Sequence, residues 1–353
     1  MESAVTQPPP REQPSRTPNI DPALYDQLLN KENEIWSKMH TDQHRAGISA
    51  EDQVAARTLR LNRDSISLAN FAKKNGIRWK MGLSLGCGEG RFERQLLEAD
   101  LCEQLDAIDI AEASVASGAR IAAEKNLPIA YGVQDLNCCT LAPGKYDLVA
   151  AQTCLHHIVE LEHLADQIHQ SLQPDGYLWI HDFIGETKFQ FVEERIRICN
   201  DLLNILPPEF RVDRFTDETL DAFERPHPDR LASPFEAIRS AEILPVFLER
   251  FEIVERSESN ALLHIICPPG YRPNYIEQPN GQVIFNRGPA GRNKLVALSV
   301  LTKQARRWPA DRSRPRRALS APLCGSILHG LCRRCRYISP KSCRRHSRRL
   351  RFF

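Results

Sequence analysis

The sequence LSLGCGEGRF, residues 83–92, joins an apolar strand to a helix through three glycines. Residues 81–85 have the composition of a buried strand, and a helical pattern runs over 91–99. Glycine is needed where a backbone turns sharply and lies close to a ligand, and the start of a helix offers free N–H groups. The carboxyl end of a first strand is also where doubly wound folds bind nucleotides. The stretch therefore predicts a nucleotide site or, alternatively, a plain turn between strand and helix.

Strands and helices alternate beyond this loop. Further strands are expected at 105–110, 127–133, 146–151 and 176–184, and helices at 111–125 and 158–172. Strict alternation is typical of a parallel sheet with helices on both faces. After a helix over 234–248, strands at 251–255 and 262–266, separated by a polar turn at 257–260, and an edge strand at 295–301 complete the pattern. We predict an α/β fold with a doubly wound, mainly parallel seven-stranded sheet.

Asp109 ends the second expected strand, nineteen residues after Gly90. A carboxylate at this place can accept hydrogen bonds from both ribose hydroxyls of a nucleoside. It can equally cap the helix that begins near Ala111. A dinucleotide-binding loop would carry glycine or alanine at position 91, where this chain has arginine. The spacing of the glycines, at 86, 88 and 90, is the form that methyltransferases use.

From Met81 to Ile266 the chain resembles class I S-adenosylmethionine-dependent methyltransferases, and within them a bacterial small-molecule-type subgroup. Four stretches besides the glycine loop carry the resemblance: Asp135-Leu136, Tyr146-Asp147-Leu148-Val149, Leu155-His156-His157-Ile158 and Leu172-Gln173-Pro174-Asp175-Gly176. The subgroup is indicated by residues 182–191 and 233–240. One departure is Ser84, which stands where the family often has an acidic residue.

The resemblance implies a Rossmann-like methyltransferase fold, S-adenosyl-L-methionine as cofactor and methyl transfer as activity. It places the ribose at Asp109 and the adenine at Asp135. The full set of cofactor-binding residues that it implies is Gly86, Cys87, Gly88, Gly90, Asp109, Ile110, Asp135, Leu136 and Gln152.

Three residues are candidates for catalysis. His156 and His157 follow the fourth strand, where an imidazole can accept a proton or orient an acceptor, although a structural pair would read the same. His157 is the first choice. Asp182 ends the fifth strand beside His181, and these two side chains point to opposite faces. It can bind an acceptor hydroxyl or amine, or it can pair with a basic residue such as Arg195 or Arg197.

Composition divides the chain into segments. We expect residues 1–20, with five prolines, to be disordered. Residues 21–75 are expected to form a helical lid and 76–304 the methyltransferase domain, in which an insertion at 185–232 covers the substrate. Residues 305–353 carry 15 Lys and Arg and one acid, a charge of +14, against −12 for 1–304. Such a step is typical of a disordered basic tail.

We predict no metal site in the folded body, and we read its cysteines as small buried or loop residues. In the tail, Cys332, Cys335, Cys343 and His346 have zinc-like spacing, but the segment lacks a core. Its cations are better suited to nucleic acid or an acidic surface.

Because no apolar run is long enough to cross a bilayer and the polar start lacks a secretory signal, we expect a cytoplasmic enzyme without a membrane partner. Its acceptor is expected to be a small organic molecule. Two alternatives stay open: a nucleic-acid-binding adaptor on the same fold, and an NAD(P)-dependent oxidoreductase.

Overall fold

The structure is a computed structural model of the chain. It describes residues 21–45, 68–214, 216–231, 233–259, 269–271, 274 and 297–304. The expectations for residues 1–20, for the strand at 262–266 and for the basic tail beyond residue 304 lie outside these ranges.

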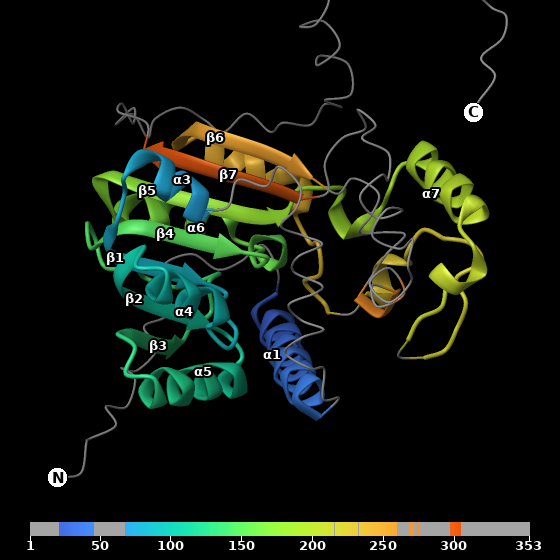
Figure 1. The fold of residues 1–353 in the computed structure, drawn as a ribbon, viewed down its shortest axis with the longest axis horizontal. Helices are drawn as coiled ribbons and strands as arrows, with labels where there is room; N and C mark the ends of the chain where they lie inside the picture. The colour runs from blue at the N-terminus through green and yellow to red at the C-terminus, as the bar shows by residue number, and fades with distance from the viewer. Residues whose placement is uncertain are drawn as a thin grey trace, which may run out of the picture. The chain divides into compact units, whose positions relative to one another are not determined.

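One seven-stranded sheet forms the centre of the described chain, in the order β3-β2-β1-β4-β5-β7-β6 (Figure 1). Five strands pair in parallel, which confirms the mainly parallel sheet that the alternation predicts. They are β1 (Trp79–Leu85), β2 (Cys102–Asp109), β3 (Ile129–Val133), β4 (Tyr146–Gln152) and β5 (Leu172–Phe183). The first strand lies between β2 and β4, so the chain order reverses there and the two neighbouring loops open away from each other. Such a switch point is where open α/β sheets bind ligands.

The last two strands differ from the expectation. β6 (Phe251–Ser259) continues through the stretch expected to turn, and β7 (Ala297–Gln304) is an inner strand instead of an edge. β7 pairs antiparallel with β5 on one side and with β6 on the other. Its ladder to β6 includes Ser257 and Ser259, so pairing with a distant segment overrides the local turn signal. The spacing of apolar residues and the positions of turn residues are local signals, so they do not show which distant strand β6 pairs with.

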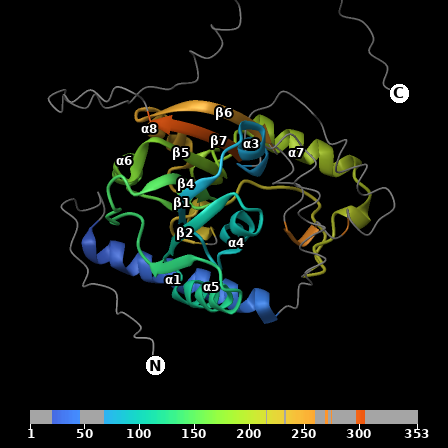
Figure 2. The same cartoon turned by 60° about the vertical axis from the view of Figure 1, so that its left-hand side comes forward.

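Helices cover both faces of the sheet (Figure 2). One apolar cluster joins β-strand residues such as Val149 and Ile180 to α6 (Leu161–Ser171) and α8 (Ile243–Leu248). The other joins Leu148 and Trp179 to α3 (Leu68–Asn75) and α4 (Arg91–Glu98). Neighbouring strand residues thus alternate between the two clusters, as the period of a strand requires. Helix α5 (Glu112–Glu124) packs on β3 and β2.

The segments outside the sheet are helical in part. Helix α1 (Pro22–Arg45) contacts α5, and the insertion after β5 holds α7 (Glu193–Ile205) with short 3-10 turns. The prediction of a helix over 234–248 is wrong for its first half. Only α8 is α-helical in this range, and a 3-10 turn at Ser240–Glu242 precedes it. Ala237 lies there with a φ of +49°, which a helix cannot contain. No helix in the described ranges is both long and apolar enough to span a bilayer.

Candidate functional site

The glycine loop leaves β1 in a conformation that side chains disfavour. Gly86, Gly88 and Gly90 have φ values of +63°, +52° and +74°. A Cβ on Gly86 would lie 2.3 Å from Cβ of Cys154, and one on Gly90 would lie 1.7 Å from the Tyr131 hydroxyl. A Cβ on Gly88 would meet no atom within 4 Å. Two glycines are therefore required by packing, whereas Gly88 leaves open space beside its backbone.

Asp109 fixes this loop. Its Oδ2 accepts a hydrogen bond of 2.7 Å from the Gly88 amide, and its Oδ1 accepts one of 2.8 Å from the Ala111 amide. Burial raises the pKa of Asp109 while these amides oppose the rise. The carboxylate thus joins the loop after β1 to the start of α5, and its remaining lone pairs are those that can accept ribose hydroxyls. Asp109 is not the N-cap of α5, because that position is Ala111, but its carboxylate accepts the amide hydrogen of Ala111.

Glu93 brings a carboxylate under the same loop. It lies on the first turn of α4, is 1% exposed and accepts a hydrogen bond from the hydroxyl of Ser84. Its second oxygen, Oε2, is buried and has no hydrogen-bond partner in the described chain. Burial raises the pKa of Glu93 to about 7, against the Ser84 hydrogen bond that lowers it. An acidic group is therefore present beside Ser84, supplied by the helix instead of the strand.

Asp135 lies beside Asp109 because the Gln134 amide donates to the carbonyl of Asp109 at 2.9 Å. Its Oδ1 accepts from the amide of Asn137. Its Oδ2 accepts a 2.8 Å hydrogen bond from the hydroxyl of Tyr25, which lies on α1. The N-terminal helix therefore reaches the residue at which the resemblance places the adenine.

The other expected cofactor residues lie along the same ends of the strands. Leu136 is buried in the core, and Ile110 and Cys87 are partly buried. Burial raises the pKa of the Cys87 thiol well above its usual range, so the thiol stays protonated. Gln152 is the last residue of β4 and pairs with His181 of β5.

The three candidate catalytic residues meet in one cluster after β4. Nδ1 of His156 lies 2.5 Å from Oδ1 of Asp182, whose other oxygen accepts from the amides of Cys154 and Leu155. Asp182 is 1% exposed, so it faces His156 and not the solvent. It does not pair with the basic residues considered for it, since Arg195 pairs with Glu186 and Arg197 with Asp201.

Two further carboxylates complete the cluster. Nδ1 of His157 lies 3.0 Å from Oε1 of Glu32 on α1, and Glu236 lies 3.5 Å from Nε2 of His156 and 3.9 Å from Nε2 of His157. Glu236 precedes Ala237, whose carbonyl accepts from the Lys188 amide at 2.7 Å. The sequence analysis missed Glu32, Glu93 and Glu236. Glu32 and Glu236 lie far from the histidines along the chain, and the local sequence around Glu93 gives no sign that its side chain is buried beneath the loop.

The pKa values in this cluster are set by the ion pairs between its histidines and carboxylates. Burial acts to lower the pKa of His156, but the Asp182 carboxylate outweighs it and raises the pKa to about 10. Burial acts to raise the pKa values of Asp182 and Glu236, and the histidines outweigh it, so both end below their ordinary values. The cluster thus holds the imidazolium of His156 between the carboxylates of Asp182 and Glu236, next to the ends of β4 and β5.

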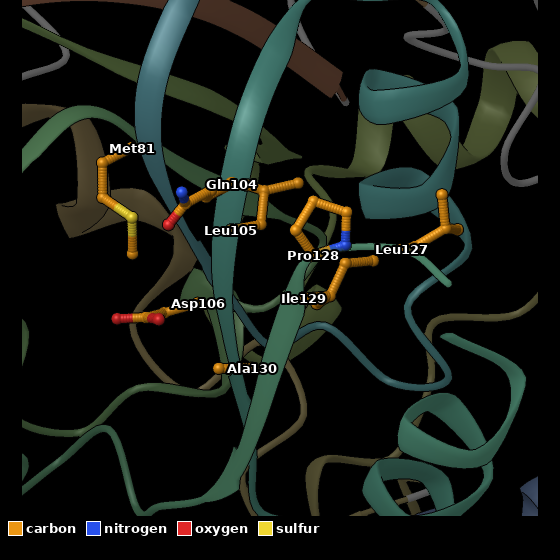
Figure 3. Close-up of a pocket in the computed structure, with 8 residues that line it drawn as sticks. All are labelled: Met81, Gln104, Leu105, Asp106, Leu127, Pro128, Ile129 and Ala130. Carbon is orange, nitrogen blue, oxygen red and sulfur yellow. The ribbon is translucent and has the colours of Figure 1, made fainter. Parts of the chain in front are cut away.

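A pocket in the described chain lies elsewhere. It is lined by Met81, residues 104–106 and residues 127–130 (Figure 3). Met81 lies in β1 and residues 104–106 in β2, whereas residues 127–130 enter and begin β3. None of these residues belongs to the glycine loop. Asp106 on its wall is engaged by Lys145 and by the hydroxyl of Tyr146. We therefore do not assign the function to this pocket.

Residues 83–180 match the family model described as a methyltransferase domain. Two curated relatives are both named "Arginine-hydroxylase NDUFAF5, mitochondrial". The one from Mus musculus is 24% identical over 170 residues, 47% of this chain and 44% of the relative. The one from Homo sapiens is 28% identical over 110 residues, 31% of this chain and 30% of the relative. The chain thus spans less than half the length of the curated relatives it matches.

Solved structures with a similar arrangement include methyltransferases. An S-adenosylmethionine-dependent methyltransferase from Mesorhizobium loti is 17% identical with a TM-score of 0.40, over 67% of this chain and 98% of that one. A geranyl diphosphate C-methyltransferase from Streptomyces coelicolor A3(2) is 11% identical with a TM-score of 0.42, over 67% of this chain and 75% of that one.

Proposed function

We propose that this chain, an S-adenosylmethionine-dependent methyltransferase with its methyltransferase domain at residues 83–180, methylates a small organic acceptor held at the His156–His157 cluster. One observation carries the proposal: the amide of Gly88 is tied to the Asp109 carboxylate at 2.7 Å, and the space beside Gly88 is open. A loop of this shape lets a nucleoside lie against the main chain while a carboxylate holds its sugar.

The residues present fit the cofactor. Asp109 ends β2 and Asp135 follows β3, and both offer carboxylate oxygens. Beneath the loop, the buried carboxyl group of Glu93 leaves its Oε2 without a hydrogen-bond partner in the described chain. When bound, S-adenosylmethionine supplies a methyl group already activated on a sulfonium. The protein then needs chiefly to align the acceptor and exclude water, and alignment can supply about 7–11 kcal/mol of the barrier.

On the acceptor side, His157 and His156 are the proposed catalytic residues. Each imidazole is oriented by a carboxylate at Nδ1, Glu32 for His157 and Asp182 for His156, and both Nε2 atoms lie on the side of Glu236. The acceptor is proposed to bind on this side. Asp182 is buried, so in this proposal it acts by positioning His156 instead of touching the acceptor. When no metal ion is bound there, a proton leaving the acceptor would be taken at Nε2 of His157.

The cover over the acceptor is proposed to come from α1 and the insertion at 185–232. Glu32 accepts hydrogen bonds from Trp36 and from the Phe235 amide, so α1 is tied to the segment that carries Glu236. The insertion has a small core of its own, in which Phe191 and Leu203 pack with Phe183 at the end of β5. A covered site of this kind favours a small acceptor over a macromolecule.

The test is incubation of the full chain with methyl-labelled S-adenosylmethionine and fractionated cell extract. We expect label in a small-molecule fraction, and its loss in Asp109→Ala. Undiminished labelling by Asp109→Ala would remove Asp109 from the site. Binding of NAD(P) without binding of S-adenosylmethionine would favour the oxidoreductase. RNA binding that disappears on removal of residues 305–353, with no methyl transfer, would favour the adaptor.

The names of the two curated relatives favour a second candidate, hydroxylation. A parallel incubation in air with an added two-electron reductant, so that one atom of O₂ can enter the product and the other leave as water, separates it from methylation. Mass spectrometry distinguishes the addition of an oxygen atom from that of a methylene. An oxygenated product without a methylated one would replace the proposed function.

A further inference from the structure

We propose that His156, His157 and Glu236 form a binding site for one divalent transition-metal ion. The three side chains offer ligand atoms that all lie within 4.8 Å of one another. Two imidazoles and a carboxylate are a donor set suited to Zn²⁺ or Fe²⁺, whereas Mg²⁺ and Ca²⁺ prefer oxygen alone. The inference does not depend on methyl transfer, because its readout is the metal itself.

The orientation of the imidazoles supports the site. Metal-binding histidines usually donate their other ring N–H to a carboxylate, which fixes the tautomer and aims the ligand nitrogen. Both histidines have this partner at Nδ1, namely Asp182 at 2.5 Å for His156 and Glu32 at 3.0 Å for His157. Both Nε2 atoms are thereby turned toward Glu236. The outer carboxylates come from β5 and from α1, so two distant elements converge on one centre.

The three side chains would have to close in slightly on a bound metal ion, because their ligand atoms lie within 4.8 Å of one another. Zinc holds nitrogen and oxygen ligands at about 2.0–2.2 Å, so neighbouring ligand atoms in a tetrahedron lie roughly 3.3 Å apart. Oε1 of Glu236 lies 3.5 Å from Nε2 of His156, and its Oε2 lies 3.9 Å from Nε2 of His157. The side chains are 11%, 13% and 14% exposed, so the three are largely shielded from solvent. Three protein ligands leave a position for water or substrate.

The backbone next to Glu236 is held in a costly conformation. Ala237 has a φ of +49°, a region that costs a residue other than glycine about 1–3 kcal/mol. Hydrogen bonds hold the strained residue on both sides: the Lys188 amide donates to its carbonyl, and the Ile238 amide donates to the carbonyl of His156. This turn aims Glu236 at the histidines, and stored strain of this kind is typical of ligand sites.

The experiment is a titration of the metal-free full chain with Zn²⁺ against a chromogenic chelator. Cys332→Ser and Cys335→Ser are introduced first, because the spacing of the tail cysteines is zinc-like and their thiols could compete for the ion. This double variant is the parent for all further substitutions. We expect one Zn²⁺ per chain. Glu236→Gln and His157→Gln should weaken binding by more than about 100-fold, and Glu32→Gln by about 10- to 100-fold, the effect usual for an outer partner. The control is Glu224→Gln, because Glu224 is an exposed residue of the insertion, and this variant should bind Zn²⁺ as tightly as the parent does.

Binding of Co²⁺, followed by absorption spectroscopy, tests the proposal even if a variant of the triad His156, His157 and Glu236 fails to fold. In the parent, Co²⁺ should give weak visible absorption typical of nitrogen and oxygen ligands, without the intense near-ultraviolet band of a cobalt–thiolate bond. Stoichiometric binding that the triad variants lose supports the site. Absence of stoichiometric binding, unchanged binding in Glu236→Gln and His157→Gln, or a thiolate band in the parent would each overturn it.

Discussion

Nδ1 of His156 lies 2.5 Å from Oδ1 of Asp182, and both side chains are buried at the ends of β4 and β5. The same carboxylate accepts hydrogen bonds from the amides of Cys154, Leu155 and Phe183. It therefore holds the turn after β4 as well as the imidazole. This pairing is the link between the core of the sheet and the proposed acceptor site.

Asp182→Asn should destabilise the fold. Removing the charge from a buried pair leaves His156 without its counter-charge, at a cost of about 3–5 kcal/mol. The measurement is the free energy of unfolding in urea. The matched control is Asp201→Asn, since Asp201 pairs with Arg197 at a site where both side chains are more than half exposed, and such a pair contributes about 0–1 kcal/mol. Equal losses for the two variants would contradict the structural role of Asp182.

Gly88→Ala should impair cofactor binding more than it impairs folding. Gly88 and Gly144 share a positive φ, +52° and +60°, and an added Cβ meets nothing within 4 Å at either. Both alanine variants should therefore lose about 1–2 kcal/mol of stability from the left-handed conformation. Only Gly88→Ala places a methyl group where S-adenosylmethionine is proposed to lie. Calorimetric titration should show weakened binding for Gly88→Ala alone, and equal affinity for both variants would argue against this cofactor position.

Glu93→Gln should make the protein more stable at high pH than the wild type. Because burial raises the pKa of Glu93 from 4.5 to about 7, the folded state keeps a proton that the unfolded chain releases. The stability that the buried, protonated carboxyl group of Glu93 contributes to the fold is fully present below pH 4.5. It is lost as the pH rises through about 7. Glutamine mimics the protonated form and escapes this loss, which amounts to roughly 3 kcal/mol at about 1.4 kcal/mol for each unit of pKa.

The Glu93 effect is measured as the difference in unfolding free energy between variant and wild type at pH 5 and at pH 8. The unfolding free energy of the variant should rise relative to that of the wild type as the pH increases. Glu98→Gln is the control on the same helix, because Glu98 is half exposed and pairs with Lys125 at the surface. A pH-independent difference for Glu93→Gln would show that its carboxyl group is not held protonated in the fold.

The alternating part of the chain was predictable from sequence because its signals are local. Periodicity located β1 through β5 and the helices between them to within a few residues, and glycine spacing located the loop. The inner position of β7 was missed because it depends on pairing with two distant strands. For the same reason the sequence indicated His156 and Asp182 but not their contact, and it gave no sign that Glu32 and Glu236 lie beside the histidines.

The most direct measurement is the equilibrium binding of S-adenosylmethionine to the full chain, compared with Asp109→Ala and with NAD⁺. The wild type should bind one S-adenosylmethionine per chain and no NAD⁺. Asp109→Ala loses the acceptor for Gly88 and the proposed ribose ligand, so its affinity should fall at least tenfold, about 1.4 kcal/mol. Binding of NAD⁺ alone, or unchanged affinity for S-adenosylmethionine in a folded Asp109→Ala, would contradict the site described above.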